Sequence, residues 1–357
     1  YQRDMEMAFA SQEDVFAVLE DVLPPVFEKY GTYNTASKAP FRRISYHDAM
    51  EVYGSDKPDT RFGMEITDIS DIVKNCGFSV FKDAIANGGS VRGIVAKGAA
   101  AKLTRKEIDK QTEFVRGIGA KGLAYVRWVD DAPNCSFAKF MGEGELEAIL
   151  KALGCEKGDV ALIVADKDKV TLPVLGALRL KIAKQLDIIP EGWNFLWIVE
   201  FPFFEYDDES GEWLAMHHPF TMPLDECIPY LDTDKAKVRA KCYDLVLNGI
   251  ELSSGSIRIT DPELQQHMFE MLGMTDEEIN AKFGFLVDAY KYGAPPHGGA
   301  GIGLDRLAML MCGCDSLRDV TAFPKVQNAS ELMSEAPSTV SEEQLKELGI
   351  AIVNSEE

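Results

Sequence analysis

The sequence predicts an α+β fold, in which one antiparallel sheet flanked by helices is interrupted by an inserted α/β module. Two residue patterns along the chain support this prediction. Residues 62–186 alternate short β-branched runs with helical stretches, which is typical of an α/β module. After Pro190 the apolar runs lengthen and their connections become short and polar, which favours antiparallel strands. We therefore expect residues 1–61 and 187–357 to build one domain around a second domain, residues 62–186.

The chain opens with a predicted strand and two predicted helices. Gln2, Asp4 and Glu6 share one face of the predicted strand, and the other face has the apolar residues Met5, Met7 and Phe9, with the period of two that a strand shows. Ser11 and Asp14 form a capping-box pattern that begins a helix. The Pro24–Pro25 pair is expected to disrupt that helix, and Gly31 lies just past its expected end. A second helix is expected over residues 45–53. The polar, turn-rich stretch that continues to residue 61 indicates a domain boundary.

Within the predicted module, basic residues outnumber acidic ones between residues 92 and 127. A solvated helix face and an RNA contact explain this pattern equally well. The basic residues are Arg92, Lys97, Lys102, Arg105, Lys106, Lys110, Arg116, Lys121 and Arg127.

The composition excludes several classes of protein. The 357 residues include 37 Lys and Arg against 58 Asp and Glu, a formal net charge of −21. This charge argues against a protein that binds nucleic acid non-specifically over its whole surface. No apolar stretch approaches the roughly 20 residues of a membrane span, and no signal peptide is visible. The seven cysteines show no zinc-ligand spacing, so we expect buried, reduced thiols and a cytoplasmic location.

A predicted hairpin places two acids on one face of the sheet. Asn248-Gly249 is a strong turn signal, and with that turn Val246 lies opposite Glu251. Asp244 then shares the face of Glu251 on a diagonal of about 7–8 Å. The pair is either a solvated edge or a site for Mg²⁺ and the phosphates of a nucleotide, and the apolar strands around it favour the second interpretation.

The strand after the hairpin leads to a possible anion-binding group. In a regular strand Arg258 faces away from Glu251, but a bulge at Gly255 would bring both side chains to one face. There the guanidinium would bind a carboxylate or a phosphate; a surface arginine is the equal alternative. Of His217 and His218, which follow a predicted strand, at most one is expected to face a cleft, in a binding or a structural role.

A glycine-rich strand runs into a helix over residues 295–310. The segment lacks the Gly-Lys-Ser/Thr of a P-loop and the dinucleotide fingerprint. Its glycines would let a ligand approach the backbone, and Arg306 in the first helical turn would add a cation where anions are already favoured. The alternative is a tightly packed strand that ends at a capping Asp305.

Together, these segments resemble the bacterial aspartyl-tRNA synthetases, which are class II enzymes. The resemblance covers essentially the whole chain, and the module resembles the insertion domain (GAD-like) that this family shares with the amidotransferase B subunit. The segments that carry it are 53–59 (YGSDKPD), 216–221 (MHHPFT), 243–251 (YDLVLNGIE), 255–259 (GSIRI) and 303–306 (GLDR).

The resemblance implies an aspartate–tRNA ligase, which joins L-aspartate to tRNA(Asp) with ATP and Mg²⁺. By this resemblance the catalytic residues are Arg258, Arg306 and Glu251, and Arg258 reads the side chain of aspartate. The implied aspartate-binding residues are Arg258, His217, Gln2 and Asp4; the implied ATP-binding residues are Glu251, Gly303, Leu304, Asp305 and Arg306; the implied Mg²⁺ ligands are Asp244 and Glu251.

The family pattern also contains an anticodon-binding domain, motif 1 at a homodimer interface, and a complete motif 2. The chain corresponds to the C-terminal part of that pattern, beginning at the end of motif 2. We therefore expect the chain alone to form no adenylate at a useful rate. Two alternatives remain: a protein that holds tRNA through the basic residues without catalysis, and an amino-acid ligase that does not use tRNA.

Overall fold

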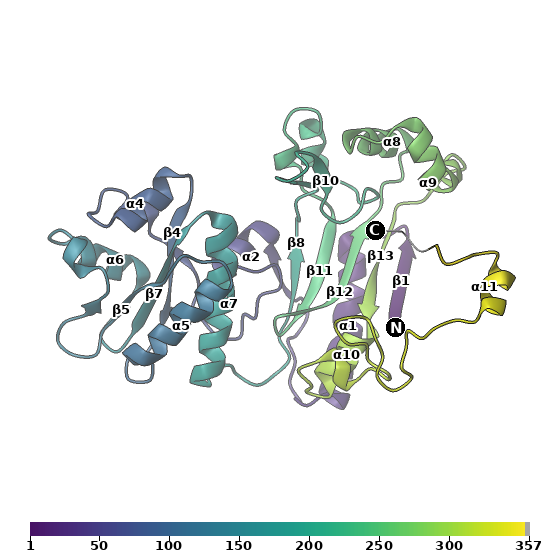
Figure 1. The fold of residues 1–357 in the computed structure, drawn as a ribbon. Helices are drawn as coiled ribbons and strands as arrows, with labels where there is room; N and C mark the ends of the chain where they lie inside the picture. Colours follow the sequence, from purple (N-terminus) through teal and green to yellow (C-terminus); the bar gives the residue numbers. More distant parts are fainter. Residues whose placement is uncertain (354–357) are drawn as a thin grey trace.

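The computed structural model describes residues 1–353, which contain one large mixed sheet and a second sheet beside it (Figure 1). The large sheet has six strands in the order β1-β13-β12-β11-β8-β2. All neighbours are antiparallel except β2 and β8, so the predicted antiparallel sheet is confirmed. The strands are β1 Gln2–Ala8, β2 Arg42–Ser45, β8 Phe195–Val199, β11 Cys242–Leu247, β12 Ile250–Ile257 and β13 His297–Gly303.

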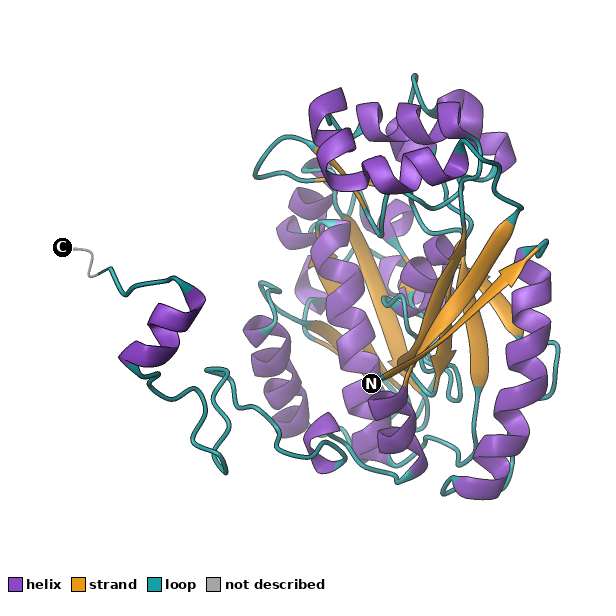
Figure 2. Ribbon diagram, turned by 90° about the vertical axis from the view of Figure 1, so that its right-hand side faces the viewer, coloured by secondary structure: helices purple, strands orange, loops and turns teal. Residues whose placement is uncertain are grey.

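Helices and loops cover both faces of this sheet (Figures 1 and 2). Helices α1 (Gln12–Tyr30) and α10 (Leu304–Met311) pack on one face. Helix α2 (Tyr46–Tyr53), α8 (Pro262–Met271) and the loops between β8 and β11 pack on the other. Helix α9 (Asp276–Tyr290) lies against α8, and β9 (Phe204–Tyr206) and β10 (Trp213–Ala215) form a small separate hairpin.

The expected disruption at Pro24–Pro25 is wrong, because α1 continues through both prolines, but the expected end just before Gly31 is confirmed, since α1 ends at Tyr30. Leu19, Leu23 and Phe27 are buried at helical spacing along one side of α1, against the sheet. This burial outweighs the hydrogen bonds that two prolines remove from the helix, since tertiary packing supplies most of a helix's stability. The predicted start is confirmed: the Asp14 carboxylate accepts a 2.8 Å hydrogen bond from the Ser11 backbone.

The inserted segment forms its own five-stranded antiparallel sheet, in the order β3-β4-β7-β5-β6. Helices α5 (Arg105–Gly117) and α7 (Asp168–Leu186) pack on one face, and α3 (Ser70–Val73), α4 (Ser79–Ala86) and α6 (Glu145–Leu153) on the other. The limits 62–186 stay a prediction. The strands are β3 Thr67–Asp68, β4 Ser90–Ala96, β5 Ala124–Arg127, β6 Asn134–Cys135 and β7 Val160–Asp166.

Most of the nine basic residues between positions 92 and 127 have acidic partners. Lys97 lies 2.9 Å from Asp159, and Lys121 lies 3.2 Å from Asp166. Similar ion pairs join Arg105, Lys110 and Arg116 to acids of α5, and Arg92 is buried. These pairings favour the solvated-face interpretation over an RNA contact.

The end of the chain stands apart from the sheets. Helix α11 (Glu342–Leu348) projects away from the body on an extended segment (Figure 2). All seven cysteines are free thiols, but the expected burial holds for only four of them: Cys135 and Cys314 are part-buried, and Cys312 is exposed just past the end of α10. Among residues 1–353, no helix combines the length and the apolar character that a membrane span requires.

A buried carboxylate joins α1 to the sheet and gives a test of the core. Glu20 Oε1 accepts hydrogen bonds from Trp197 Nε1 at 2.9 Å and from the Phe41 backbone at 3.1 Å. Glu20→Ala leaves both donors buried without a partner, so we expect it to lower the free energy of unfolding by about 3 kcal/mol in urea titration. Asp21→Ala, at an exposed position of the same helix, is the control; equal effects of the two changes would contradict this role of Glu20.

Candidate active site

One irregularity in β12 brings the predicted site residues to a single face. Val246 lies opposite Glu251 as predicted, but Leu245 pairs with Ser253, so Leu252 is an extra residue in β12. The bulge is therefore at Leu252 and not at Gly255, which pairs regularly. Past this bulge, alternate residues starting at Ser254 share the face of Asp244 and Glu251. Arg258 thus lies on the same face as the acids.

Gly255 has a different role from the predicted one. A Cβ at this position would lie 2.1 Å from the carbonyl oxygen of Gly299 in β13 and 2.6 Å from the Tyr243 ring. The glycine is needed because β12, β13 and Tyr243 approach too closely for any side chain.

The acidic end of the site centres on Asp244. Its side chain is only 6% exposed, and its Oδ1 atom has no hydrogen-bond partner in the structure. Burial is the main cause that raises the pKa of Asp244 to about 7; the Ser254 hydroxyl lowers this pKa, and the charges of Glu251 and Asp56 raise it. A buried oxygen without a donor is suited to a bound cation.

Glu251 is held between two basic groups. Arg306, in the first turn of α10, donates from Nη1 to Glu251 Oε1 at 3.0 Å and to the Glu251 backbone oxygen at 2.7 Å. Lys57 Nζ lies 3.8 Å from the other carboxylate oxygen. The structure therefore brings together Asp244, Glu251 and Arg306, and it adds Lys57, from the segment that indicates a boundary and that also carries part of the family resemblance.

The glycine-rich segment forms β13 and runs directly into α10, as predicted. Gly303 pairs with Gln2 at the end of β13, and Leu304 N donates to the Tyr1 oxygen at 3.1 Å. Asp305 accepts a 2.8 Å hydrogen bond from the Tyr1 amino group. These three residues lie beside the start of β1, next to Arg306.

The second end of the site is a cavity of about 210 Å³ around Arg258. Arg258 Nη1 donates to Ser256 Oγ at 2.9 Å and contacts the ring nitrogens of His218. Burial, the Arg258 charge and His217 together lower the pKa of His218 to about 4, so this ring is neutral near pH 7. The wall also contains Gln2, Asp4, Glu6, His217 and Ser254.

The expectation that only one histidine faces a cleft is wrong, because both line this cavity. Strand β10 ends at Ala215, so the two residues lie in a loop in which side chains do not alternate. His217 Nδ1 lies 3.9 Å from Cys242 Sγ, while His218 contacts Arg258.

The cavity also has acidic side chains from β1, because Asp4 and Glu6 line it. Gln2 Nε2 donates to Asp4 Oδ1 at 2.6 Å, so these two predicted residues form one unit. A Cβ at Gly301 would lie 2.2 Å from Gln2 Nε2, so the glycine makes space for that side chain. A cavity lined by both a cation and carboxylates matches a small molecule that carries both charges.

Several site residues escaped the sequence analysis. Lys57 lies in the segment YGSDKPD, which was interpreted as a boundary. Because this segment also carries the family resemblance, the motif could have identified Lys57 as a site residue. Spacing alone could not show which of His217 and His218 contacts Arg258. Glu6 lies two residues after Asp4 on the same face of β1, a period that would have included it.

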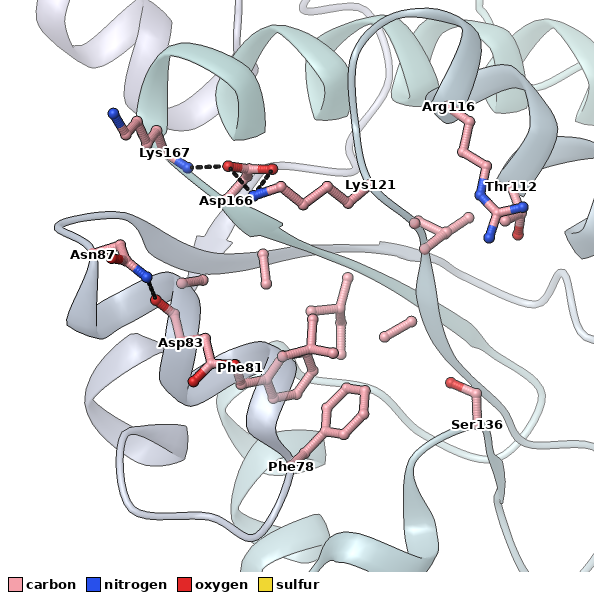
Figure 3. Close-up of a pocket in the computed structure, with 17 residues that line it drawn as sticks. Phe78, Phe81, Asp83, Asn87, Thr112, Arg116, Lys121, Ser136, Asp166 and Lys167 are labelled. Atoms are coloured by element: carbon pink, nitrogen blue, oxygen red, sulfur yellow. Dashed lines mark hydrogen bonds and ion pairs between the residues drawn. The ribbon is translucent and has the colours of Figure 1, made fainter.

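A larger cavity of about 720 Å³ lies in the inserted module, away from these residues (Figure 3). Phe78 and Phe81 form one side of it, and Lys121 bridges both oxygens of Asp166 on the opposite side. None of the predicted site residues lines this cavity.

A family model described as tRNA synthetases class II (D, K and N) matches residues 1–327. The chain belongs to this family. An aspartate–tRNA ligase of Clostridium perfringens is 52% identical over 358 residues, covering all of this chain and 60% of that protein. An aspartate–tRNA(Asp/Asn) ligase of Caldanaerobacter subterraneus is 53% identical over 352 residues, covering 98% of this chain and 59% of that protein.

This class II chain thus spans about 60% of the length of the curated relatives it matches. Among solved structures, an aspartyl tRNA synthetase from Entamoeba histolytica aligns with a TM-score of 0.42 at 17% identity, covering 93% of this chain and 44% of that chain.

The buried Asp244 carboxyl makes stability depend on pH in a definite direction. Its pKa is about 7 in the folded chain against an ordinary value of 3.8. Ionisation of this carboxyl therefore destabilises the folded state increasingly as the pH rises between these two values, and the effect is complete above the higher one. Below the lower value the carboxyl is protonated in both the folded and the unfolded chain, and the effect disappears. In Mg²⁺-free buffer we expect Asp244→Asn to unfold at a higher temperature than the unchanged chain. The gap should be largest above about pH 7 and should narrow toward about pH 5.

Thermal unfolding followed by circular dichroism measures this gap. Asp130→Asn, at an exposed position, is the control and should unfold with the unchanged chain at each pH. A gap that stays constant over the whole range would contradict the assignment.

Proposed function

We propose that this chain carries the site that activates L-aspartate with ATP and transfers it to tRNA(Asp), the reaction of an aspartate–tRNA ligase. One observation carries the proposal: a single face of the sheet holds a cavity lined by Arg258 and Asp4 and an acid pair at Asp244 and Glu251. The first suits an acidic amino acid, and the second suits a nucleotide with its metal ion. The names of the relatives support the same reaction.

The cavity explains how aspartate is chosen. The Arg258 fork binds two carboxylate oxygens at once, whereas asparagine offers an amide whose NH₂ group faces the same donors. Neutral His218 contacts the guanidinium without a second positive charge. Asp4, held by Gln2, lines the same cavity and would bind the ammonium group of the amino acid.

The acidic end fits Mg²⁺. Within residues 1–353 no group of three or more potential ligand side chains is assembled, but Mg²⁺ in nucleotide sites needs only one or two carboxylates beside the phosphates. Asp244, with its unpartnered oxygen, and Glu251 would hold the ion. When bound, Mg²⁺ neutralises charge on the phosphates of ATP. Arg306, next to Glu251, adds a fixed cation for the same purpose.

The chemistry needs positioning rather than a protein nucleophile. An α-carboxylate oxygen of aspartate attacks the α-phosphorus of ATP, and the bond to the bridging oxygen breaks, so that pyrophosphate leaves with the electron pair. A hydroxyl of the terminal ribose of tRNA then attacks the aspartyl carbonyl, loses its proton, and AMP leaves. Arg258 and Asp4 hold aspartate during both steps, while Arg306 and Glu251 orient ATP.

The remaining expectations belong to this proposal. A homodimer, a cytoplasmic location and the choice of tRNA(Asp) rest on the family resemblance. The alternative of tRNA binding without catalysis loses support, because most of the basic residues on which it depends are paired with acids.

Arg258→Leu tests the aspartate site. In the natural polypeptide that contains this chain, we expect the change to lower aspartate-dependent ATP–pyrophosphate exchange by more than about 100-fold, because it removes a charged partner of a buried carboxylate. Arg318→Leu, at an exposed position, is the control and should leave exchange unchanged. Normal exchange in the Arg258→Leu protein would rule out the assigned role.

A further inference from the structure

Helix α7 of the inserted module lies directly against the segment that reaches the acidic end of the site. A Cβ at Gly176 in α7 would lie 2.4 Å from the Gly54 carbonyl oxygen, and a Cβ at Gly54 would lie 2.1 Å from the Leu172 carbonyl oxygen. Helix and segment therefore meet backbone to backbone, which only glycines permit. This contact joins the module to residues 54–64.

Arg179, three residues further along α7, reinforces the contact. Its side chain is only 1% exposed, and Nη2 donates to the backbone oxygens of Asp59 at 3.0 Å and Gly63 at 3.1 Å. The guanidinium also lies over the rings of Phe62 and Tyr53, with 4.4 Å and 5.1 Å to the ring centroids.

The partners of Arg179 are unusual for a buried cation. Among the described residues no carboxylate lies within ion-pair distance of it, so its hydrogen bonds go to backbone oxygens. A buried guanidinium that loses such acceptors is strongly unfavourable, so this arrangement fixes the path of residues 59–64.

The fixed segment in turn abuts the hairpin that carries Glu251. Asp59 is 2% exposed, and both its carboxylate oxygens are bound by Arg61, at 3.0 Å from Nε and 2.7 Å from Nη2. A Cβ at Gly249, in the turn between β11 and β12, would lie 3.1 Å from the Asp59 Cβ. Two residues before Asp59, Lys57 reaches the Glu251 carboxylate.

We propose that Arg179 is a positioning residue for the proposed ATP end of the site: it holds residues 59–64 against the β11–β12 turn and so sets Lys57 and Glu251. The inserted module thereby helps to shape the site on the large sheet. The inference rests on the proposed function, and it concerns residues that are distinct from the lining of the cavity around Arg258, which among the described residues includes none of residues 54–64.

Steady-state ATP–pyrophosphate exchange in the natural polypeptide that contains this chain tests the proposal. We expect Arg179→Met to raise the KM for Mg·ATP about tenfold, within the usual range of coupling between sites, and to leave the KM for aspartate unchanged. Arg179→Lys, which keeps the charge with fewer directed donors, should shift the same KM by less. Lys184→Met, an exposed cation of the same helix, is the control and should change neither KM.

A loss of kcat with both KM values unchanged would overturn the proposal, because it would show only fewer folded molecules. The double variant gives a further test. If Arg179 acts through Lys57, adding Arg179→Met to a Lys57→Met protein should raise the KM for Mg·ATP little further. Independent, additive increases in this KM would contradict an action of Arg179 through Lys57.

Hydrogen exchange gives a readout that does not need activity. Arg179→Met should speed amide exchange in residues 54–64 and 246–252, and Lys184→Met should not. Unchanged exchange there would overturn the positioning role. If the unchanged protein shows no pyrophosphate exchange while the hydrogen-exchange result holds, the proposed function fails and the structural coupling stands.

Discussion

The site depends on one extra residue in β12. The Asn248-Gly249 turn sets Val246 opposite Glu251, and the bulge at Leu252 then shifts every later residue by one position. Leu252 is 1% exposed, so its side chain is anchored in the core beneath the sheet. Without this bulge Arg258 would point to the opposite face, and the acidic end and the cavity around Arg258 would be on different sides of the sheet.

Close backbone approach then gives the site its shape. Gly255, Gly299 and Gly301 let β1, β12 and β13 pack without side chains between them, which leaves space for Gln2 on the cavity side. The stabilising contacts are elsewhere, where Phe16 stacks on Trp197 at 4.0 Å between ring centroids. The site itself includes an unfavourable feature, the buried Asp244, which a bound cation would relieve.

The sequence predicted the parts of this site that depend on local patterns. The turn signal fixed the hairpin register near the turn, and the glycine-rich strand before α10 was evident from its residues. The position of the bulge could not be predicted from local residues. It depends on how β12 packs against β13, which is a contact between distant parts of the chain. The same reason explains the unbroken α1, since the burial of Leu23 and Phe27 is a tertiary effect that propensity rules omit.

Loop residues were the least predictable. The two histidines follow β10 in a loop, so strand alternation gave the wrong expectation, and only the fold shows that His218 contacts Arg258. Lys57 and Asp59 lie in a segment whose composition indicates a boundary, yet Arg179 of the module and the β11–β12 turn enclose it.

The most direct test of the central claim maps where Mn²⁺·ATP binds, by paramagnetic broadening of backbone amide signals. If one face holds a single two-ended site, broadening is strongest at residues 244–251 and 303–306. Adding aspartate should then perturb residues 217–218 and 258 in the same molecule. Broadening centred on the module cavity around Phe78, or aspartate shifts far from Arg258, would contradict the account.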